Sequence, residues 1–324
     1  AASDVYKRQP SAGLNDLRRA VAEDAGRRRG VELQPGQVVI GPGAKPALFF
    51  TTLALVCPGD EVIYPDPGFP TYRAMIEVAG GVPVPVPLSE QDDFSFDMEA
   101  FNDLVSQRTR LVVINTPSNP TGGVIPPADL ARIADRAVRE DFGVISDEIY
   151  SRQVNAPVAP RIFSLPGMAE RTVISDGISK TYAMTAWRQG YGIMPLSLAD
   201  KVALLQNHSL GSTGEFTQIA GIEALQGDQT QVEAVVAEFQ RRRDLLVDGL
   251  NDIPGVSCRV PQGAFYAFPN VKAFGRKSDW LADYLLEEAG VALLPGTAFG
   301  ASGEGYLRLC FANSIQDLQR ALEL

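Results

Sequence analysis

Short apolar segments alternate with helix-like segments along the first two thirds of the chain. The expected strands are rich in valine and isoleucine and cover residues 38–40, 61–64, 82–86, 111–115, 143–146, 173–175 and 191–193. The expected helices are 45–56, a segment after Pro70, 98–105 and 128–140. Because a strand–helix–strand order favours neighbouring parallel strands, the sequence predicts an α/β fold on a mostly parallel sheet. Alternating valine and proline in residues 82–87 predicts an edge strand.

The last third of the chain has a different, mixed pattern. Residues 229–250 carry apolar side chains at helical spacing, and we expect this helix to bridge a large and a small domain. Strands are expected at 256–259, 264–268, 291–294 and 306–311, and helices at 279–288 and after Ser314. With 324 residues and 45% hydrophobic content, the chain can bury a large core. We expect a non-native leader at 1–9, a remnant of an N-terminal segment at 10–37, a large domain at 38–240 and a small α+β domain at 241–324.

The acidic composition argues against two classes of partner. A formal net charge of −10 disfavours nucleic acid and anionic membranes, because both need clustered lysine and arginine. Two basic triplets occur, at 27–29 and 241–243, and we interpret both as solvated helix faces.

Cysteine and histidine usage excludes further chemistries. The three cysteines lack the spacing of a metal site or a disulfide framework, and the chain has one histidine. We therefore expect no metal. The sequence has no apolar run of the ~20 residues that a membrane span needs and no secretory signal pattern, so a cytoplasmic location is expected.

One lysine and one aspartate follow neighbouring expected strands. Asp147 ends the apolar run 143–146, and Lys180 follows the run 173–175. Singly, a lysine is usually a solvated surface group and an aspartate after a strand is usually a helix cap. Together they are what pyridoxal phosphate requires: an amine to form the Schiff base and a carboxylate to keep the ring nitrogen protonated.

Five motifs, in order along the chain, resemble the class I/II aminotransferases, the fold-type-I pyridoxal-phosphate enzymes related to aspartate aminotransferase. They are Gly43-Ala44-Lys45, Asn119-Pro120-Thr121-Gly122, Ser146-Asp147-Glu148-Ile149-Tyr150, Ser179-Lys180 through Trp187-Arg188, and Tyr306-Leu307-Arg308. The resemblance implies a three-layer α/β/α domain with a seven-stranded sheet and a smaller α+β domain. It also implies a homodimer that exchanges an amino group between an α-amino acid, aspartate-like or aromatic, and a 2-oxo acid by a ping-pong cycle.

The resemblance assigns the catalytic roles to three residues. Lys180 would form the Schiff base and shuttle the proton, and Asp147 would pair with the pyridinium nitrogen. Tyr150 would direct its phenol at the ring oxygen of the cofactor. Asn119 would donate to the same oxygen and also border the substrate. Read alone, Asn119-Pro120 is a turn signal.

The remaining implied roles concern the cofactor phosphate, the cofactor ring and the substrate carboxylate. Gly43, Ala44 and Lys45 would receive the phosphate at a helix N-terminus, where the dipole favours an anion. Ser179 and Arg188 would add contacts to it. Phe69 would stack on the pyridine face, and Arg308 would grip the substrate α-carboxylate with its bidentate fork.

Two departures from the family pattern accompany this resemblance. Gly177 stands where the family often has a phosphate-binding serine, which predicts weaker cofactor binding. The family tyrosine that reaches a neighbouring subunit's phosphate aligns with Arg8, inside the expected leader, so an N-terminal truncation is expected.

Two other functions remain open at this point. One is a lyase or synthase on the same cofactor scaffold, because fold and cofactor do not fix the reaction. The other is an aminotransferase-like effector domain of a transcription regulator.

Overall fold

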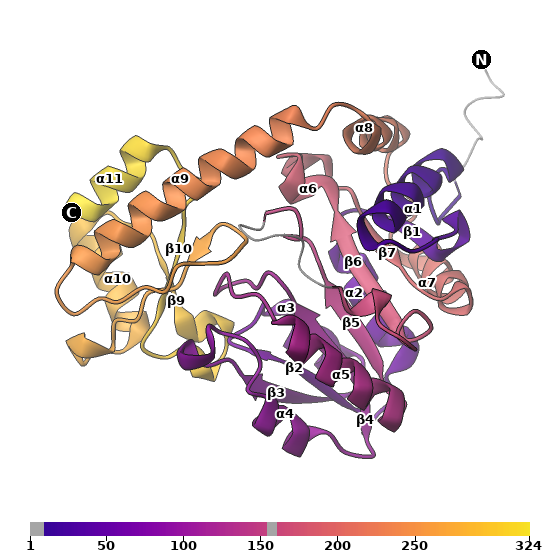
Figure 1. The fold of residues 1–324 in the computed structure, drawn as a ribbon, viewed down its shortest axis with the longest axis horizontal. Helices are drawn as coiled ribbons and strands as arrows, with labels where there is room; N and C mark the ends of the chain where they lie inside the picture. The colour runs from indigo at the N-terminus through magenta and orange to yellow at the C-terminus, as the bar shows by residue number, and fades with distance from the viewer. Residues whose placement is uncertain (1–9, 154–160) are drawn as a thin grey trace.

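A seven-stranded sheet forms the centre of the larger part of the molecule (Figure 1). The structure, a computed structural model, describes residues 10–153 and 161–324, so the expected leader and Arg8 lie outside the described residues. In spatial order the strands are β1 (Val38–Gly41), β7 (Gly190–Ile193), β6 (Thr172–Gly177), β5 (Gly143–Asp147), β4 (Thr109–Asn115), β2 (Glu61–Asp66) and β3 (Val82–Pro87). Only β7 runs antiparallel to its neighbours in this sheet, and β3 is an edge strand. The predicted mostly parallel sheet is confirmed.

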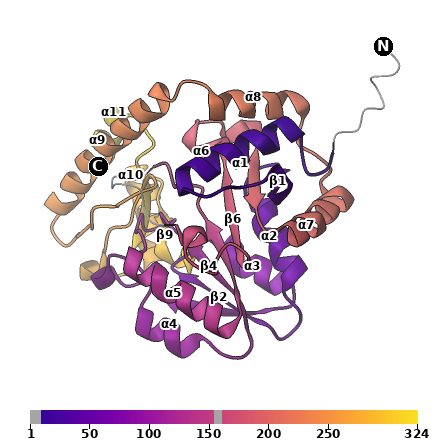
Figure 2. The same cartoon turned by 45° about the vertical axis from the view of Figure 1, so that its right-hand side comes forward.

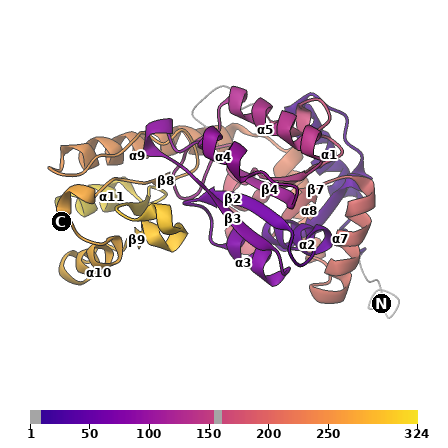
Figure 3. The same ribbon diagram turned by 90° about the horizontal axis from the view of Figure 1, so that it is seen from below.

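Helices cover both faces of this sheet, because successive side chains of each buried strand point to opposite faces. Val39, Val113 and Ile145 pack with one set of helices: α2 (Lys45–Leu55), α3 (Thr71–Val78) and α7 (Leu196–Ser209). Their neighbours Ile40 and Val144 pack with the other set: α1 (Asn15–Arg29), α4 (Met98–Leu104), α5 (Pro127–Glu140) and α8 (Glu215–Gln226). Figure 3 shows α1 and α5 on one side of the sheet and α2, α3 and α7 on the other, which is the three-layer architecture expected.

Four helices were not anticipated from the sequence: α1, α7, α8 and the single turn α6 (Ile178–Thr181). Helix α1 lies beside α8 (Figure 2) and buries Leu17, Val21 and Ala25 against the sheet. Many buried positions in these helices are small or polar, such as Thr217 and Gln218 in α8, so their apolar periodicity is weak. Segment 10–37 thus contributes a helix to one outer layer.

The C-terminal part is a smaller α+β unit. Its antiparallel sheet has the order β8 (Tyr266–Ala267), β10 (Leu307–Cys310), β9 (Leu294–Pro295). Its helices are α9 (Thr230–Asp252), α10 (Ser278–Ala289) and α11 (Ile315–Glu323). Helix α9 runs from the region of α8 to the side of α11, as the expected bridging helix should (Figure 1).

Three expected strands of this unit are wrong in whole or in part. Segment 256–259 forms only an isolated bridge, because the Asn251 side chain takes up both backbone hydrogen-bonding groups of Cys258. Segment 264–268 shrinks to β8, because Ala264 has a φ of 59° and cannot be extended. In segment 291–294 only Leu294 belongs to a strand, β9. The N–H of Val291 instead donates to the carbonyl oxygen of Leu285 at the end of α10.

The arginine triplets are solvated helix faces only in part, so that expectation is partly wrong. The side chains of Arg28 and Arg29 are 14% and 0% exposed, because the last turn of α1 rests on the sheet. Arg243 is 14% exposed, whereas Arg27 and Arg241 do face solvent.

Within the described ranges, no helix has both the length and the apolar character needed to cross a membrane.

Candidate active site

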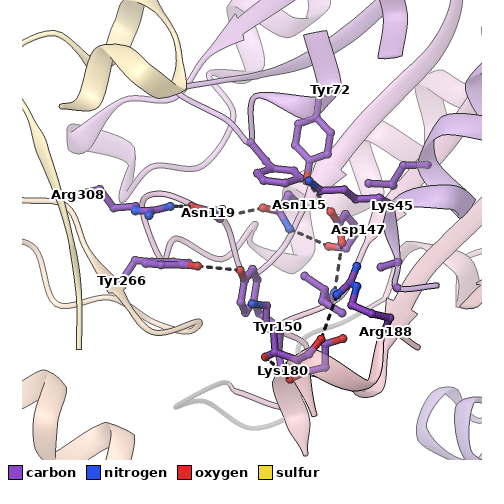
Figure 4. A pocket seen from close by; sticks show the side chains of 17 residues that line it. Lys45, Tyr72, Asn115, Asn119, Asp147, Tyr150, Lys180, Arg188, Tyr266 and Arg308 are labelled. Atoms are coloured by element: carbon purple, nitrogen blue, oxygen red, sulfur yellow. Dashed lines mark hydrogen bonds between the residues drawn. The ribbon is translucent and has the colours of Figure 1, made fainter. Parts of the chain in front are cut away.

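One pocket at the carboxyl ends of the parallel strands contains all eleven residues to which the resemblance assigns a role (Figure 4), whereas Gly177 does not line it. Its cavity of about 320 Å³ falls in the range of small-molecule sites, about 300–1,000 Å³. The carboxyl edge of a parallel sheet is where α/β proteins bind ligands, because strand-to-helix loops converge there. The eleven residues are Gly43, Ala44, Lys45, Phe69, Asn119, Asp147, Tyr150, Ser179, Lys180, Arg188 and Arg308.

Asp147 is the last residue of β5, and its carboxylate is buried. It accepts a 2.8 Å hydrogen bond from the Tyr72 hydroxyl and a longer one, 3.4 Å, from the N–H of Ile149. Burial raises the pKa of Asp147 to about 6, and the nearby carboxylates of Asp176 and Glu148 also raise it. Among the described residues no cationic side chain forms an ion pair with it. Such a carboxylate fits a cationic ligand group in the pocket.

Lys180 lies in the single turn α6, which follows β6 directly. The Gln153 side chain donates to the Lys180 carbonyl oxygen over 2.9 Å and so fixes the backbone of the turn. The Lys180 Nζ lies 5.5 Å from the centre of the Phe265 ring. Burial lowers the pKa of Lys180, and the positive charges of Arg188 and Arg308 lower it further against an opposing effect of Cys310. A lowered pKa makes the amine a better nucleophile near neutral pH.

Tyr150 and two asparagines complete the floor of the pocket. The Tyr150 and Tyr266 hydroxyls are 3.2 Å apart, and burial raises the pKa of Tyr150 well above its ordinary value. The Asn115 amide donates to the Asp147 carbonyl oxygen over 3.0 Å, and its side-chain oxygen accepts from the N–H of Asn119 over 2.8 Å. These bonds tie the loop after β4 to the end of β5.

Arg308 enters the pocket from β10 of the C-terminal unit. Its guanidinium lies 4.4 Å from the Tyr266 ring centre and 4.7 Å from that of Phe299, and it donates to the Asn119 side-chain oxygen over 3.1 Å. Its buried Nε has no hydrogen-bond partner, and no described carboxylate forms an ion pair with it. Positive charge and free donors suit this side chain to bind a carboxylate.

A second group of positively charged side chains lies across the pocket, at the N-terminus of α2. Gly43 has a φ of 93°, and a Cβ on it would come within 2.6 Å of the Arg188 guanidinium. That guanidinium donates to the carbonyl oxygens of Pro42 and Thr185, each over 3.2 Å. Lys45 lies over the ring of Phe69, with its Nζ 5.2 Å from the ring centre. Ser179 joins Arg188 in lining this side, which suits a phosphate.

Sequence reasoning missed six further lining residues, of which Tyr72, Asn115 and Tyr266 make the hydrogen bonds above. Tyr72 occupies a core position of α3, and Tyr266 comes from a two-residue strand, so neither carried a local signal. Asn115 ended the expected strand 111–115 and could have been found by the same strand-end reasoning that found Asp147. The other three are Leu48, Ile149 and Thr185.

Within the described residues, no group of three or more histidine, cysteine, aspartate or glutamate side chains is arranged to hold a metal ion.

Comparison with known proteins assigns the chain to a family. The family model "Aminotransferase class I and II" matches residues 1–324. A putative aminotransferase, YugH, of Bacillus subtilis is 39% identical over 96% of this chain and 81% of its own length. An aspartate aminotransferase of Pyrococcus horikoshii is 37% identical over 97% of this chain and 80% of its own length. The crystal structure of an aromatic aminotransferase from Pyrococcus horikoshii superposes with a TM-score of 0.95 and 37% identity, covering 99% of this chain and 87% of that one.

The chain therefore belongs to the class I and II aminotransferases. This family consists of transferases of fold type I that use pyridoxal 5′-phosphate and act on amino acids and 2-oxo acids, so the chain is a pyridoxal-phosphate-dependent aminotransferase.

Proposed function

We propose that this enzyme moves an amino group between an α-amino acid and a 2-oxo acid by a ping-pong mechanism, with Lys180 as the reactive amine. Aspartate-like or aromatic donors are favoured, because relatives at 36–37% identity are named aspartate and aromatic-amino-acid aminotransferases. The observation that carries the proposal is the meeting, in one pocket, of the buried Asp147 carboxylate with the Lys180 amine and the Arg308 guanidinium.

The donor set of the pocket fits pyridoxal phosphate. The group supplies, when bound, an aldehyde that condenses with amines and a pyridinium ring that takes up the electron pair released at the substrate Cα. The Asp147 carboxylate, raised in pKa and without a cationic partner among the described residues, suits the pyridinium N–H. Gly43, Ala44, Lys45, Ser179 and Arg188 would hold the phosphate, and Phe69 would lie against the ring.

Lys180 has two tasks in this proposal. Its amine would condense with the cofactor aldehyde, which its lowered pKa favours. Once displaced by the substrate amine, the Lys180 amine would take the proton from the substrate Cα as a base. It would then donate that proton, as an acid, to the cofactor carbon C4′. Tyr150 and Asn119 would donate to the cofactor's ring oxygen and keep the ring fixed while the proton moves.

Arg308 sets the orientation of the substrate. A bidentate pair between its guanidinium and the α-carboxylate would fix the Cα–H bond relative to the Lys180 amine. The Arg308 guanidinium lies over the rings of Tyr266 and Phe299, which hold it in place. Little side-chain freedom is therefore lost when the substrate binds.

A homodimer is part of the proposal. Four large apolar side chains near α6, α7 and α8 are exposed: Trp187 (44%), Leu210 (51%), Phe216 (75%) and Ile219 (56%). Apolar surface of this kind is typical of protein interfaces, and η5 (Thr185–Trp187), which carries Trp187, borders Arg188 of the pocket.

The proposed reaction is tested by single-turnover assay. Protein loaded with pyridoxal phosphate is mixed with aspartate, with an aromatic amino acid and with alanine, and the 2-oxo acid product is quantified in the absence of an acceptor. We expect one equivalent of 2-oxo acid per site, and none from Lys180→Ala, while Lys201→Ala, an exposed lysine of α7, behaves as wild type. Release of ammonia in place of amino transfer would indicate the lyase alternative.

A further inference from the structure

Six charged side chains are buried on the side of the sheet that α1 covers. They are the arginines Arg28, Arg29 and Arg161 and the carboxylates Asp24, Glu148 and Asp176, and none is more than 14% exposed. We call them the α1 ion cluster. Asp147 meets Tyr72 of α3 on one face of the sheet, whereas the next residue, Glu148, meets Arg29 of α1 on the other.

Glu148 is held from three directions. It forms an ion pair with Arg29, accepts a 3.1 Å hydrogen bond from the Ser146 hydroxyl, and lies 3.9 Å from the Arg161 Nε. Its own N–H donates to the Ser175 carbonyl oxygen over 2.8 Å. The loop that begins at Asp147 is therefore joined both to α1 and to the neighbouring strand β6.

Asp176 is held in the same way near the end of β6. It accepts from the Tyr191 hydroxyl over 3.3 Å and from the N–H of Gly177 over 2.7 Å, and Arg28 lies 3.5 Å away. Arg28 also pairs with Asp24 in its own helix over 2.8 Å. Four residues after Asp176 comes Lys180.

We propose that Glu148 and Asp176 are positioning residues, which use the arginines of α1 to fix the Asp147–Tyr150 loop and the Lys180 turn relative to each other. Asp147 is adjacent to Glu148, and Lys180 follows Asp176 by four residues. Glu148 pairs with Arg29 and Asp176 with Arg28, which are consecutive residues of α1. The inference rests on the proposed function, because it takes Asp147 and Lys180 as the acting groups.

Stability alone does not account for such a cluster. Burying an ion pair costs about as much free energy in desolvation as the pair returns, and well-packed apolar residues often serve the fold equally well. Catalysis is more demanding, since a misplacement of about 1 Å can reduce a rate about 100-fold. A rigid polar connection between two catalytic loops meets that demand.

The test compares Glu148→Gln with Glu61→Gln. Glu61 is a matched control, because it is also buried at a strand terminus and paired with an arginine, Arg108, but lies at the amino end of β2. For Glu148→Gln we expect kcat of the amino-acid half-reaction to fall at least about 10-fold while KM stays within about 3-fold, because Glu148 does not line the pocket. Glu61→Gln should change neither value.

A second readout uses the cofactor-free protein and does not depend on activity. Amide hydrogen exchange of 147–151 and 177–181 should accelerate in Glu148→Gln and stay unchanged in Glu61→Gln. If the wild type shows no half-reaction, the proposed function fails, and the exchange data still decide whether the cluster orders these two loops. Unchanged exchange in both loops, or unchanged kcat in an active enzyme, would overturn the positioning role.

The double variant Arg29→Met/Glu148→Met covers the case in which Glu148→Gln does not fold. Removing both charges leaves neither member of the Arg29–Glu148 pair buried alone. Arg161 loses its 3.9 Å contact with Glu148 but keeps its 2.8 Å hydrogen bond to the Arg28 carbonyl oxygen, so we expect a melting temperature within about 5 °C of wild type. We still expect kcat to be reduced about 10-fold or more and exchange in the two loops to be faster. A double variant with normal stability, kcat and exchange would reduce the cluster to a structural role.

Discussion

At the scale of single residues, three side chains of the pocket lack ion-pair partners among the described residues. Burial raises the pKa of the Asp147 carboxyl and lowers the pKa of the Lys180 amine. Arg308 keeps a buried Nε without a hydrogen-bond partner. Each is unfavourable for the folded chain alone. In the proposed function each would become favourable when a cationic ring, an aldehyde and a carboxylate enter the pocket.

The first prediction concerns how the ionised Asp147 carboxylate lowers the free energy of unfolding of the cofactor-free protein. Its carboxyl pKa is raised from 3.8 to about 6, so the folded state binds the proton more tightly than the unfolded state does. The tighter proton binding stabilises the folded state. Its contribution is complete below pH 3.8 and is lost as the pH rises through about 6. At pH 8, Asp147→Asn should therefore raise the free energy of unfolding by about 1–3 kcal/mol, measured by urea titration.

The same variant should lose amino transfer by about three orders of magnitude or more, since an amide cannot keep the ring nitrogen protonated. The stability gain should disappear at pH 4. A variant less stable than wild type at pH 8 would show that the Asp147 carboxylate is not a strained group.

The second prediction concerns Arg308. Replacement by lysine keeps the charge but removes the planar fork, so KM for the amino donor should rise about 10- to 100-fold with a smaller change in kcat. Arg276→Lys is the control, because Arg276 also stacks on an aromatic ring, Trp280, but lies away from the pocket. An unchanged KM in Arg308→Lys would remove Arg308 from substrate binding.

At the scale of elements, the pocket exists because loops after parallel strands open at the same sheet edge. The motifs could be predicted to meet because Gly43, Asn119, Asp147 and Lys180 each follow an expected strand. Helix α1 could not be predicted in the same way. Its buried positions include Asp24 and Arg29, which look solvated until their partners are known: Arg28 in the same helix for Asp24, and Glu148 just after β5 for Arg29.

The third prediction tests the turn between β1 and α2. Gly43→Ala places a Cβ at a φ of 93° and within 2.6 Å of the Arg188 guanidinium, so it should weaken pyridoxal phosphate binding at least about 10-fold. Gly59→Ala is the matched control, with a φ of 94° and no atom within 4 Å of the new Cβ. It shares the backbone strain without the contact. Equal cofactor dissociation constants for the two variants would contradict a phosphate site at Gly43.

At the scale of the whole molecule, the pocket joins two parts of the chain. Arg308 and Tyr266 reach it from the C-terminal sheet, while the other functional groups come from the ends of the seven-stranded sheet and from the loops and helices that follow its strands. Tyr266 was missed because its role depends on this junction: β8 has two residues, and only the pairing of β8 with β10 brings its ring under Arg308. Long-range packing of this kind leaves no trace in local sequence.

The fourth prediction concerns assembly. If the exposed apolar side chains near α8 form a dimer interface, Phe216→Asp should shift the protein from dimer to monomer in light scattering, because a charge would be buried at the interface. Val78→Asp, at an exposed apolar position on α3, should leave the mass unchanged. A monomeric wild type, or a Phe216→Asp dimer, would place any interface elsewhere.

The identity of the reactive amine is the central claim, and borohydride trapping tests it most directly. Borohydride fixes the cofactor covalently to whichever lysine holds it, and peptide mass mapping then locates the adduct. We predict a single stoichiometric adduct on Lys180, absent from Lys180→Ala, with none on Lys45 although that lysine lines the same pocket. An adduct on Lys45, or none on Lys180 in protein that binds the cofactor, would contradict the account.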